Sequence, residues 1–226
     1  MSFTLDRVVP WGRSFAEYAA MFALTDTDLR GRILGAGDGP AAFNAELTRR
    51  GGRVVSVDPL YQYPAAAIRA RIDAVFPAVM AETERNRDEF VWTTIGSPKE
   101  LARLRRSAME TFLADYAARG TASRYVAGAL PHLPFADGAF DCALCSHYLF
   151  LYSEQLTADD HAAALRELAR VAREVRVFPL LELGARPSRH LPAVLDRLTA
   201  AGHAIEYITV PYEFQRGGNR MLRLHR

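Results

Sequence analysis

The stretch ILGAGDGPAAFNAELTRRGGRVVSVD, residues 33–58, contains the signals of a strand, a glycine-rich turn, a helix and a second strand. Three alternating glycines follow the first apolar residues: Gly35, Gly37 and Gly39. Glycines at the end of a strand let the backbone adopt positive φ and approach a ligand closely. The helix is predicted over about residues 41–50, before the helix-ending pair of glycines at 51 and 52. A unit of this kind begins a doubly wound α/β sheet.

The glycine turn and Asp58 together predict a ligand that contains a nucleoside. The N-terminus of the helix presents free N–H groups and a partial positive charge. A carboxylate at the end of the second strand can accept hydrogen bonds from ribose hydroxyls. Dinucleotide-binding proteins prefer G-x-G-x-x-G, but the register from Gly35 places Pro40 at the third glycine. The register from Gly37 places Ala42 there, so the spacing is closer to G-x-G-x-G.

Strand and helix signals alternate again from residue 124 onward. Five further segments predict strands: residues 124–128, 141–148, 174–181, 204–210 and 219–226. A helix is predicted after Thr157 and another over residues 188–201. A short loop joins the last two strands, which indicates an antiparallel pair. We therefore predict an α/β fold with a Rossmann-like seven-stranded sheet, mostly parallel with an antiparallel last strand, and helices on both faces.

Helical segments precede and interrupt this alternation, within what we predict to be one domain over residues 1–226. The N-terminal segment, residues 1–30, is predicted to be helical. Residues 60–121 carry little strand signal and indicate a helical insertion after the second strand. One of its helices begins at Ser97, and Glu100 is predicted to complete a capping box. Because the insertion leaves the sheet beside the glycine turn, we expect it to act as a lid over a bound molecule.

Composition excludes several classes of partner. The 226 residues include 28 Lys and Arg against 26 Asp and Glu, a formal charge of +2. This balance gives no electrostatic argument for binding nucleic acid or an anionic membrane. The N-terminus carries Asp6 and lacks the apolar core of a signal peptide, and no apolar run approaches the roughly 20 residues of a membrane span. We therefore predict a cytoplasmic protein without membrane contact.

The two cysteines, Cys142 and Cys145, form a C-x-x-C pair inside a predicted strand. Such spacing occurs in redox and zinc sites. Residues i and i+3 of a strand point to opposite faces of the sheet, however. Two further zinc ligands at suitable spacing are also missing from the sequence. We predict two buried structural thiols and no metal site.

The segment around the glycine turn resembles motif I of the class I S-adenosylmethionine-dependent methyltransferases, whose pattern is roughly h-h-D-h-G-x-G-x-G, where h is apolar. The apolar positions and the first two glycines are matched by Ile33, Leu34, Gly37 and Gly39. Asp58 falls at the usual distance for the acid that binds the ribose. Gly35 replaces the family's acid, which helps to position the methionine end of the cofactor, and Ala41 replaces the third glycine.

A second segment, LPFADGAFDCALCSHYLFLY at residues 133–152, resembles a later motif of the same family, L-P-F-x-D-x-[SA]-F-D followed by an apolar strand. In the family the preceding loop lies along the adenine, where an acid commonly holds the amino group. Here Ala129 stands near the place of that acid, and Leu130 is expected to pack on the ring. We interpret Asp141 as a structural residue at the start of the strand. As a whole, the chain resembles uncharacterised bacterial members of the superfamily.

The resemblance implies an S-adenosylmethionine-dependent methyltransferase that acts on an undefined small-molecule acceptor. The implied cofactor-binding residues are Arg13, Gly35, Ala36, Gly37, Gly39, Asp58, Pro59, Leu130, Ser146 and His147. Arg13 is the candidate partner of the cofactor's carboxylate. His147, at the end of the fourth predicted strand, is the candidate catalytic base, and the alternative is a hydrogen-bonded histidine in the pocket wall.

Two other functions share some of these features. An NAD(P)-dependent oxidoreductase would share the glycine turn and the ribose acid. A non-catalytic S-adenosylmethionine-binding protein would be consistent with Gly35 and Ala129 in place of the two acids. Nucleic acid is disfavoured as a partner because the basic residues of the insertion are interspersed with acidic ones. In addition, SHYLF at residues 146–150 lacks the Asn/Asp-Pro-Pro-aromatic motif of enzymes that methylate amino groups of nucleic acids.

Overall fold

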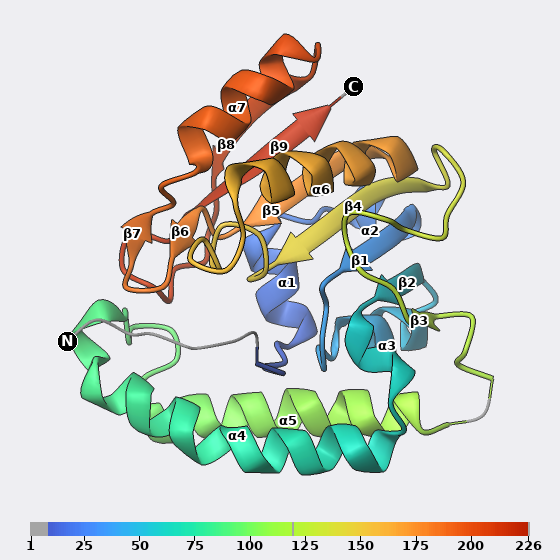
Figure 1. Ribbon diagram of the computed structural model, residues 1–226. Coiled ribbons are helices and arrows are strands. Elements are labelled where there is room, and N and C mark those ends of the chain that lie inside the picture. The colour runs from blue at the N-terminus through green and yellow to red at the C-terminus, as the bar shows by residue number, and fades with distance from the viewer. Residues whose placement is uncertain (1–8, 119, 226) are drawn as a thin grey trace.

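A seven-stranded sheet runs through the protein (Figure 1). The computed structural model describes residues 9–118 and 120–225. The strand order is β3-β2-β1-β4-β5-β9-β8, and β9 is antiparallel to both of its neighbours. The strands are β1 (Arg32–Ala36), β2 (Arg53–Val57), β3 (Tyr125–Val126), β4 (Phe140–Ser146), β5 (Ala172–Phe178), β8 (Ala204–Thr209) and β9 (Arg220–His225). The predicted mostly parallel sheet with an antiparallel last strand is confirmed.

Helices cover both faces of the sheet. They are α1 (Phe15–Met21), α2 (Asp26–Arg30), α3 (Phe43–Arg49), α4 (Ala65–Arg85), α5 (Pro98–Tyr116), α6 (Ala158–Val171) and α7 (Leu191–Ala200). Helices α6 and α7 lie on one face of the sheet, and α1 and α3 lie on the other (Figure 1). Leucines of α6 and α7 belong to the apolar core on the first face, and aromatic residues of α1 and α3 belong to the core on the second. Because both faces are covered, the central strands can consist almost entirely of apolar residues.

The two cysteines show how strand β4 supplies both cores. Cys142 belongs to the core under α1 and α3, whereas Cys145, three residues later, belongs to the core under α6 and α7. Both are free and buried, and burial raises the pKa of each thiol to about 12. The prediction of two buried structural thiols on opposite faces is confirmed.

The helix ends follow the sequence signals with one exception. The spacing of Ser14 and Glu17 at α1 produces a complete capping box. At α5, Ser97 accepts a hydrogen bond from the backbone N–H of Glu100, as predicted. The reciprocal bond of the box is not formed, however, because the Glu100 carboxylate pairs with Arg103, at 2.6 Å. The predicted capping box at α5 is therefore wrong, although the helix begins where expected.

Helices α4 and α5 lie between β2 and β3 in the chain and form a pair along one side of the molecule (Figure 1). Their contact contains an aromatic and aliphatic core that includes Ile72, Phe76 and Phe112. Two short 3-10 helices, η1 (Pro59–Gln62) and η2 (Arg87–Glu89), flank α4. The helical content predicted for residues 60–121 is thus present, while the division of the chain into one domain with a lid stays a prediction.

Two details were not predicted. A small hairpin, β6 (Leu181–Glu182) with β7 (Arg186–Pro187), follows β5, so β5 ends before the segment predicted as strand does. The strand predicted over residues 124–128 contains only two residues in strand conformation.

Within the described part of the chain, no helix combines the length and the apolar character needed to cross a lipid bilayer.

Candidate active site

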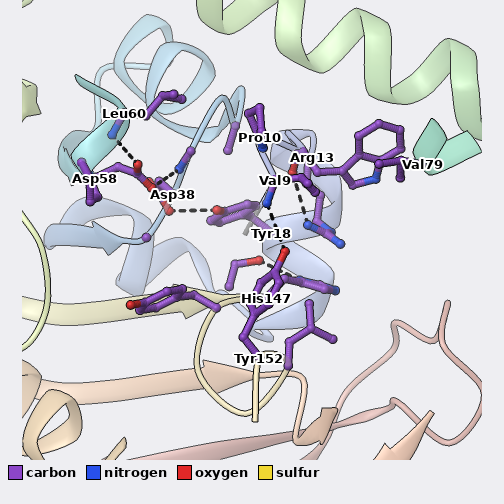
Figure 2. Close-up of a pocket in the computed structure, with 18 of the residues that line it drawn as sticks. Val9, Pro10, Arg13, Tyr18, Asp38, Asp58, Leu60, Val79, His147 and Tyr152 are labelled. Carbon is purple, nitrogen blue, oxygen red and sulfur yellow. Dashed lines mark hydrogen bonds between the residues drawn. The ribbon is translucent and has the colours of Figure 1, made fainter. Parts of the chain in front are cut away.

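A cavity of about 460 Å³ opens at the carboxyl ends of β1, β2 and β4. Its floor consists of the turn after β1, the end of β2, the loop at residues 128–130 and the residues that follow β4. Residues 9–13, the insertion and the loop before β9 form the other walls. Figure 2 shows side chains from these segments directed at the same space. Parallel α/β sheets place their ligand sites at this edge, where the strand order reverses on either side of β1 and β4.

The glycine turn and Asp58 face each other across this floor. Gly37 and Gly39 have φ angles of 68° and 51°, which disfavour any side chain. Asp58 accepts hydrogen bonds from the backbone N–H groups of Gly39, at 2.9 Å, and Leu60, at 2.8 Å. Burial raises the pKa of its carboxyl group. Each carboxylate oxygen retains further acceptor capacity toward the cavity.

Asp38 is a second carboxylate in the cavity wall, and it was not among the predicted site residues. Its oxygens accept hydrogen bonds from the hydroxyl of Tyr18, at 2.8 Å (Figure 2), and from that of Ser56, at 2.6 Å. Burial raises the pKa of Asp38 to about 6. A Cβ atom added to Gly35 would lie only 1.9 Å from one of these oxygens. The Asp38 carboxyl group therefore occupies the space that a side chain at position 35 would need.

Side chains of α6 hold the loop before β4 in place. Arg170 of α6 donates hydrogen bonds to the carbonyl oxygens of Leu133 and Phe135, and it pairs with Asp137 at 2.7 Å. Glu167 accepts a hydrogen bond from the backbone N–H of Leu133. These contacts fix the loop whose upstream part, residues 128–130, lines the cavity.

His147 follows β4 in an unusual conformation. Its φ angle is 52°, and its backbone N–H donates to the carbonyl oxygen of Phe178 at 2.7 Å. Its Nδ1 atom forms a 2.9 Å hydrogen bond with the Ser146 hydroxyl. Burial, together with the positive charges of Arg13 and Arg105, holds the pKa of His147 well below its usual range. The imidazole is therefore neutral at physiological pH and can accept a hydrogen bond.

A buried charge cluster lies close to two cavity-lining residues, Arg13 and His147. Arg105 of α5 is fully buried and pairs with Glu17 of α1 at 2.7 Å. Tyr212 donates a hydrogen bond to the same carboxylate. Arg13 contacts the cluster electrostatically and lines the cavity, but its Nε atom has no hydrogen-bond partner among the described residues. Two guanidinium groups thus share one carboxylate, which leaves a net positive charge for an anionic group of a ligand.

Comparison with known proteins agrees with this geometry. Residues 96–175 match a family model described as a methyltransferase domain. The chain is 30% identical over 219 residues, 95% of each chain, to an uncharacterised protein, MJ0045, of Methanocaldococcus jannaschii. The chain belongs to the same family as MJ0045. The matching domain bears out the sequence resemblance to S-adenosylmethionine-dependent methyltransferases, although this relative is archaeal.

A solved structure shows a similar fold. The chain shares 16% identity with magnesium protoporphyrin IX methyltransferase from Synechocystis, crystallised with S-adenosylhomocysteine, with a TM-score of 0.50 over 94% of this chain and 81% of that one. The same enzyme with S-adenosylmethionine gives a TM-score of 0.48, at 14% identity, over 94% and 77% of the two chains. At such identity the likeness concerns the fold alone.

The cavity is lined by most of the residues expected at a cofactor: Arg13, Gly37, Gly39, Asp58, Pro59, Leu130, Ser146 and His147. Gly35 and Ala36 do not line it, and the cofactor-binding role of all ten residues stays a prediction. Gly35 lies behind the Asp38 carboxyl group, and Ala36 is fully buried in the core.

Other wall residues of the cavity carry no local signal in the sequence. Tyr18 and Trp11 come from the N-terminal segment, and Phe214 comes from the loop before β9. Asp38 is the exception, because it lies within the glycine turn itself. Asp141, by contrast, accepts a hydrogen bond from the backbone N–H of Arg32 at 2.8 Å and pairs with its guanidinium group, which agrees with the predicted structural role.

Proposed function

We propose that the protein binds S-adenosylmethionine in this cavity and transfers its methyl group to a small-molecule acceptor. The observation that carries the proposal is the convergence of Asp58 and the glycine turn on one cavity whose opposite end holds an incompletely paired arginine. This order of groups matches a ligand with ribose hydroxyls at one end and a carboxylate at the other. A cytoplasmic location and a bacterial source stay predictions.

The residues that would hold the cofactor follow from this order. Asp58 would accept hydrogen bonds from the ribose, and Leu130 with Pro59 would enclose the adenine. Gly39 leaves open space, since an added Cβ atom would have no neighbour within 4 Å. Arg13, with its unpaired Nε atom, would bind the methionine carboxylate. Gly37, Ser146 and His147 would line the path between these two ends.

We assign to Asp38 the part that the family gives to an acid at position 35. Asp38 lines the cavity, and its carboxyl group fills the space beside Gly35. Two hydroxyl groups hold it in place, so it does not need to reorganise when a ligand binds. A buried carboxylate at this point favours a positively charged group next to it.

When bound, S-adenosylmethionine supplies a methyl group on a positively charged sulfur. The chain's part in the reaction is to align the acceptor and to exclude water. His147, which is neutral, would accept a hydrogen bond from the acceptor and is the candidate to receive its proton. The strained backbone at His147 supports such a role, because strain of this kind often marks functional sites.

Calorimetric titration tests cofactor binding directly. We expect both S-adenosylmethionine and S-adenosylhomocysteine to bind, and Asp58→Ala to weaken both by at least about tenfold, because it removes a charged hydrogen-bond acceptor. Asp73→Ala is the control, since Asp73 lies on an exposed face of α4 paired with Arg106, and it should leave the affinity unchanged. No binding at millimolar ligand would refute the proposal.

The same titration separates the alternatives. An NAD(P)-dependent oxidoreductase would bind the reduced nicotinamide dinucleotide and enhance its fluorescence, whereas we expect no such change. A non-catalytic protein would bind S-adenosylmethionine without ever producing S-adenosylhomocysteine in the presence of a bound acceptor. Detection of S-adenosylhomocysteine by mass spectrometry therefore distinguishes an enzyme from a binding protein.

A further inference from the structure

The side of the cavity opposite the glycine turn has a distinct chemistry. We call this side the roof and define it as the cavity-lining residues of segments 9–11, 79–101, 151–152, 183 and 214–215. Within the described residues, three charged side chains line the cavity: Asp38 and Asp58 on the floor, and Arg13 in the wall segment 9–13. The roof residues themselves carry no charge. A molecule that fills the roof side therefore meets no ionised partner there.

Apolar side chains dominate the roof, and four of its residues are aromatic: Trp11, Phe90, Tyr152 and Phe214. Phe90 of the insertion stacks on Phe214 of the loop before β9, with ring centroids 4.7 Å apart. Backbone hydrogen bonds join the same two segments. The N–H of Val91 donates to the carbonyl oxygen of Phe214 at 2.7 Å, and the N–H of Arg216 donates to the carbonyl oxygen of Glu89 at 2.8 Å. The roof thus has its apolar surface in place before any ligand binds.

Few polar groups interrupt this surface, and most of them are already engaged. The Thr83 hydroxyl donates to the carbonyl oxygen of Val79 in its own helix. The Tyr152 hydroxyl accepts a long hydrogen bond of 3.4 Å from the backbone N–H of Val9 (Figure 2). Gln215 differs, because its side-chain oxygen Oε1 is buried and has no hydrogen-bond partner within the described chain.

The backbone position of Gln215 is fixed. A β-bridge pairs its backbone with that of Phe90, so the residue lies between the insertion and the loop before β9. A buried amide oxygen without a partner is unfavourable, and a ligand that donates an O–H or N–H group relieves that cost. An ionised ligand group at the same place would be buried without a counter-charge, which is far more unfavourable.

We infer that the methyl acceptor is an uncharged, aromatic small molecule with a hydroxyl or N–H group that donates a hydrogen bond to Gln215. This inference rests on the proposed function, because it assigns the floor to the cofactor and the roof to the acceptor. It excludes acceptors whose inserted part carries a carboxylate or phosphate. Arg13 does not serve such an anion in this assignment, because the cofactor's carboxylate takes it.

Three matched probes test the inference on the full chain saturated with S-adenosylhomocysteine: 2-naphthol, naphthalene and 2-naphthoate. Binding is followed by probe fluorescence at pH 7, where the naphthol is neutral and the naphthoate is charged. We expect 2-naphthol to bind about tenfold more tightly than naphthalene, the effect of one net hydrogen bond. We expect 2-naphthoate to bind at least about a hundredfold more weakly than 2-naphthol.

Two variants connect the preference to one residue. Gln215→Leu should lower the affinity for 2-naphthol to that for naphthalene and leave naphthalene binding unchanged. Gln155→Leu, at an exposed position outside the cavity, should keep the tenfold preference. Circular dichroism and the thermal transition verify that both variants fold.

Several results would overturn the inference. One is equal or tighter binding of 2-naphthoate, another is a naphthol preference that survives in Gln215→Leu, and a third is no binding of any neutral probe up to its solubility limit. Calorimetry with S-adenosylhomocysteine alone distinguishes failure of the acceptor inference from failure of the proposed function. If that ligand binds and the probe order is reversed, the acceptor inference fails while the proposed function stands; if it does not bind, both fail.

Discussion

At the residue scale, the pair Gly35 and Asp38 explains why the glycine turn lacks an acid at position 35. The turn lacks an acid at position 35, yet the structure has a buried carboxyl group in the space next to that position. The two arrangements exclude each other, because a Cβ atom at residue 35 would lie 1.9 Å from the Asp38 oxygen. Glycine at position 35 is therefore a steric requirement of an acid at position 38.

The pKa of Asp38 predicts how cofactor binding depends on pH. Burial raises this pKa from its usual value to about 6, so the group is ionised at pH 7 and protonated at pH 5. The positively charged cofactor favours the ionised form, and its affinity should therefore fall about tenfold as the pH is lowered from 7 to 5. Asp38→Asn should bind about tenfold more weakly at pH 7 and show no step near pH 6. Calorimetry across this range is the measurement, and an unchanged step in Asp38→Asn would contradict the assignment.

A position swap supplies the control for this prediction. Gly35→Asp alone places two carboxyl groups in one space and should impair folding or binding. The double variant Gly35→Asp with Asp38→Gly returns the acid to the family's position and should recover part of the lost affinity. Recovery by the swap, but not by either single change, would show that the location of the carboxylate matters and not the identity of the residue.

At the element scale, local sequence signals were sufficient to predict helix ends, whereas contacts between distant parts of the chain could not be predicted from the sequence. The capping residues at α1 and α6 act on groups three positions away, so the sequence displays both partners side by side. The Tyr18–Asp38 hydrogen bond and the Phe90–Gln215 bridge join residues that are 20 and 125 positions apart (38 − 18 and 215 − 90). No local pattern predicts such pairs, and the acid at position 38 was overlooked for that reason. Gly37, Gly39 and Asp58, which lie within one short unit, line the same cavity, and their binding of a cofactor stays a prediction.

The Glu17–Arg105 pair ties α1 to the insertion and predicts a measurable loss of stability. Burial alone would raise the pKa of Glu17, but Arg105 and Arg13 outweigh it and lower the pKa from 4.5 to about 2. The ionised carboxylate therefore stabilises the fold above pH 4.5, and this contribution is lost as the pH falls toward 2. Glu17→Gln keeps a residue suited to the capping box but leaves Arg105 buried without a charge partner. We expect a cost of about 3 kcal/mol in urea unfolding at pH 7.

An exposed pair of the same type is the control for this variant. Glu110 and Arg69 link α5 to α4, with about half of each side chain exposed. Glu110→Gln should cost less than about 0.5 kcal/mol, because solvent screens the pair. Equal losses in the two variants would mean that the buried cluster has no special role in anchoring the insertion.

At the scale of the whole molecule, the cavity is assembled from segments that are distant in sequence. The floor comes from the ends of parallel strands, which every fold of this topology brings together. The roof comes from the N-terminal segment, the insertion, residues 151–152 and 183, and the loop before β9. The fold could thus be predicted from the periodicity and glycine signals, whereas the roof depends on how these separate segments pack. This division explains why the sequence pointed to the glycine turn and Asp58, whereas it indicated the insertion only as a lid and none of the other roof residues except Tyr152.

The buried thiols of β4 offer a test of ligand binding by the whole fold. Cys142 and Cys145 lie on a central strand and are 5% and 0% exposed. Burial raises the pKa of both thiols to about 12. A thiol reagent can therefore react with them only when the sheet opens. A ligand that binds only the folded chain stabilises it by about 2.7 kcal/mol at a hundredfold excess over its Kd, which should slow labelling about a hundredfold. Mass spectrometry with S-adenosylhomocysteine measures this rate, and Asp58→Ala at the same ligand concentration should lose most of the protection. Rapid labelling of the native protein, or a rate indifferent to ligand in the parent chain, would contradict the placement of the cofactor at the sheet's central strands.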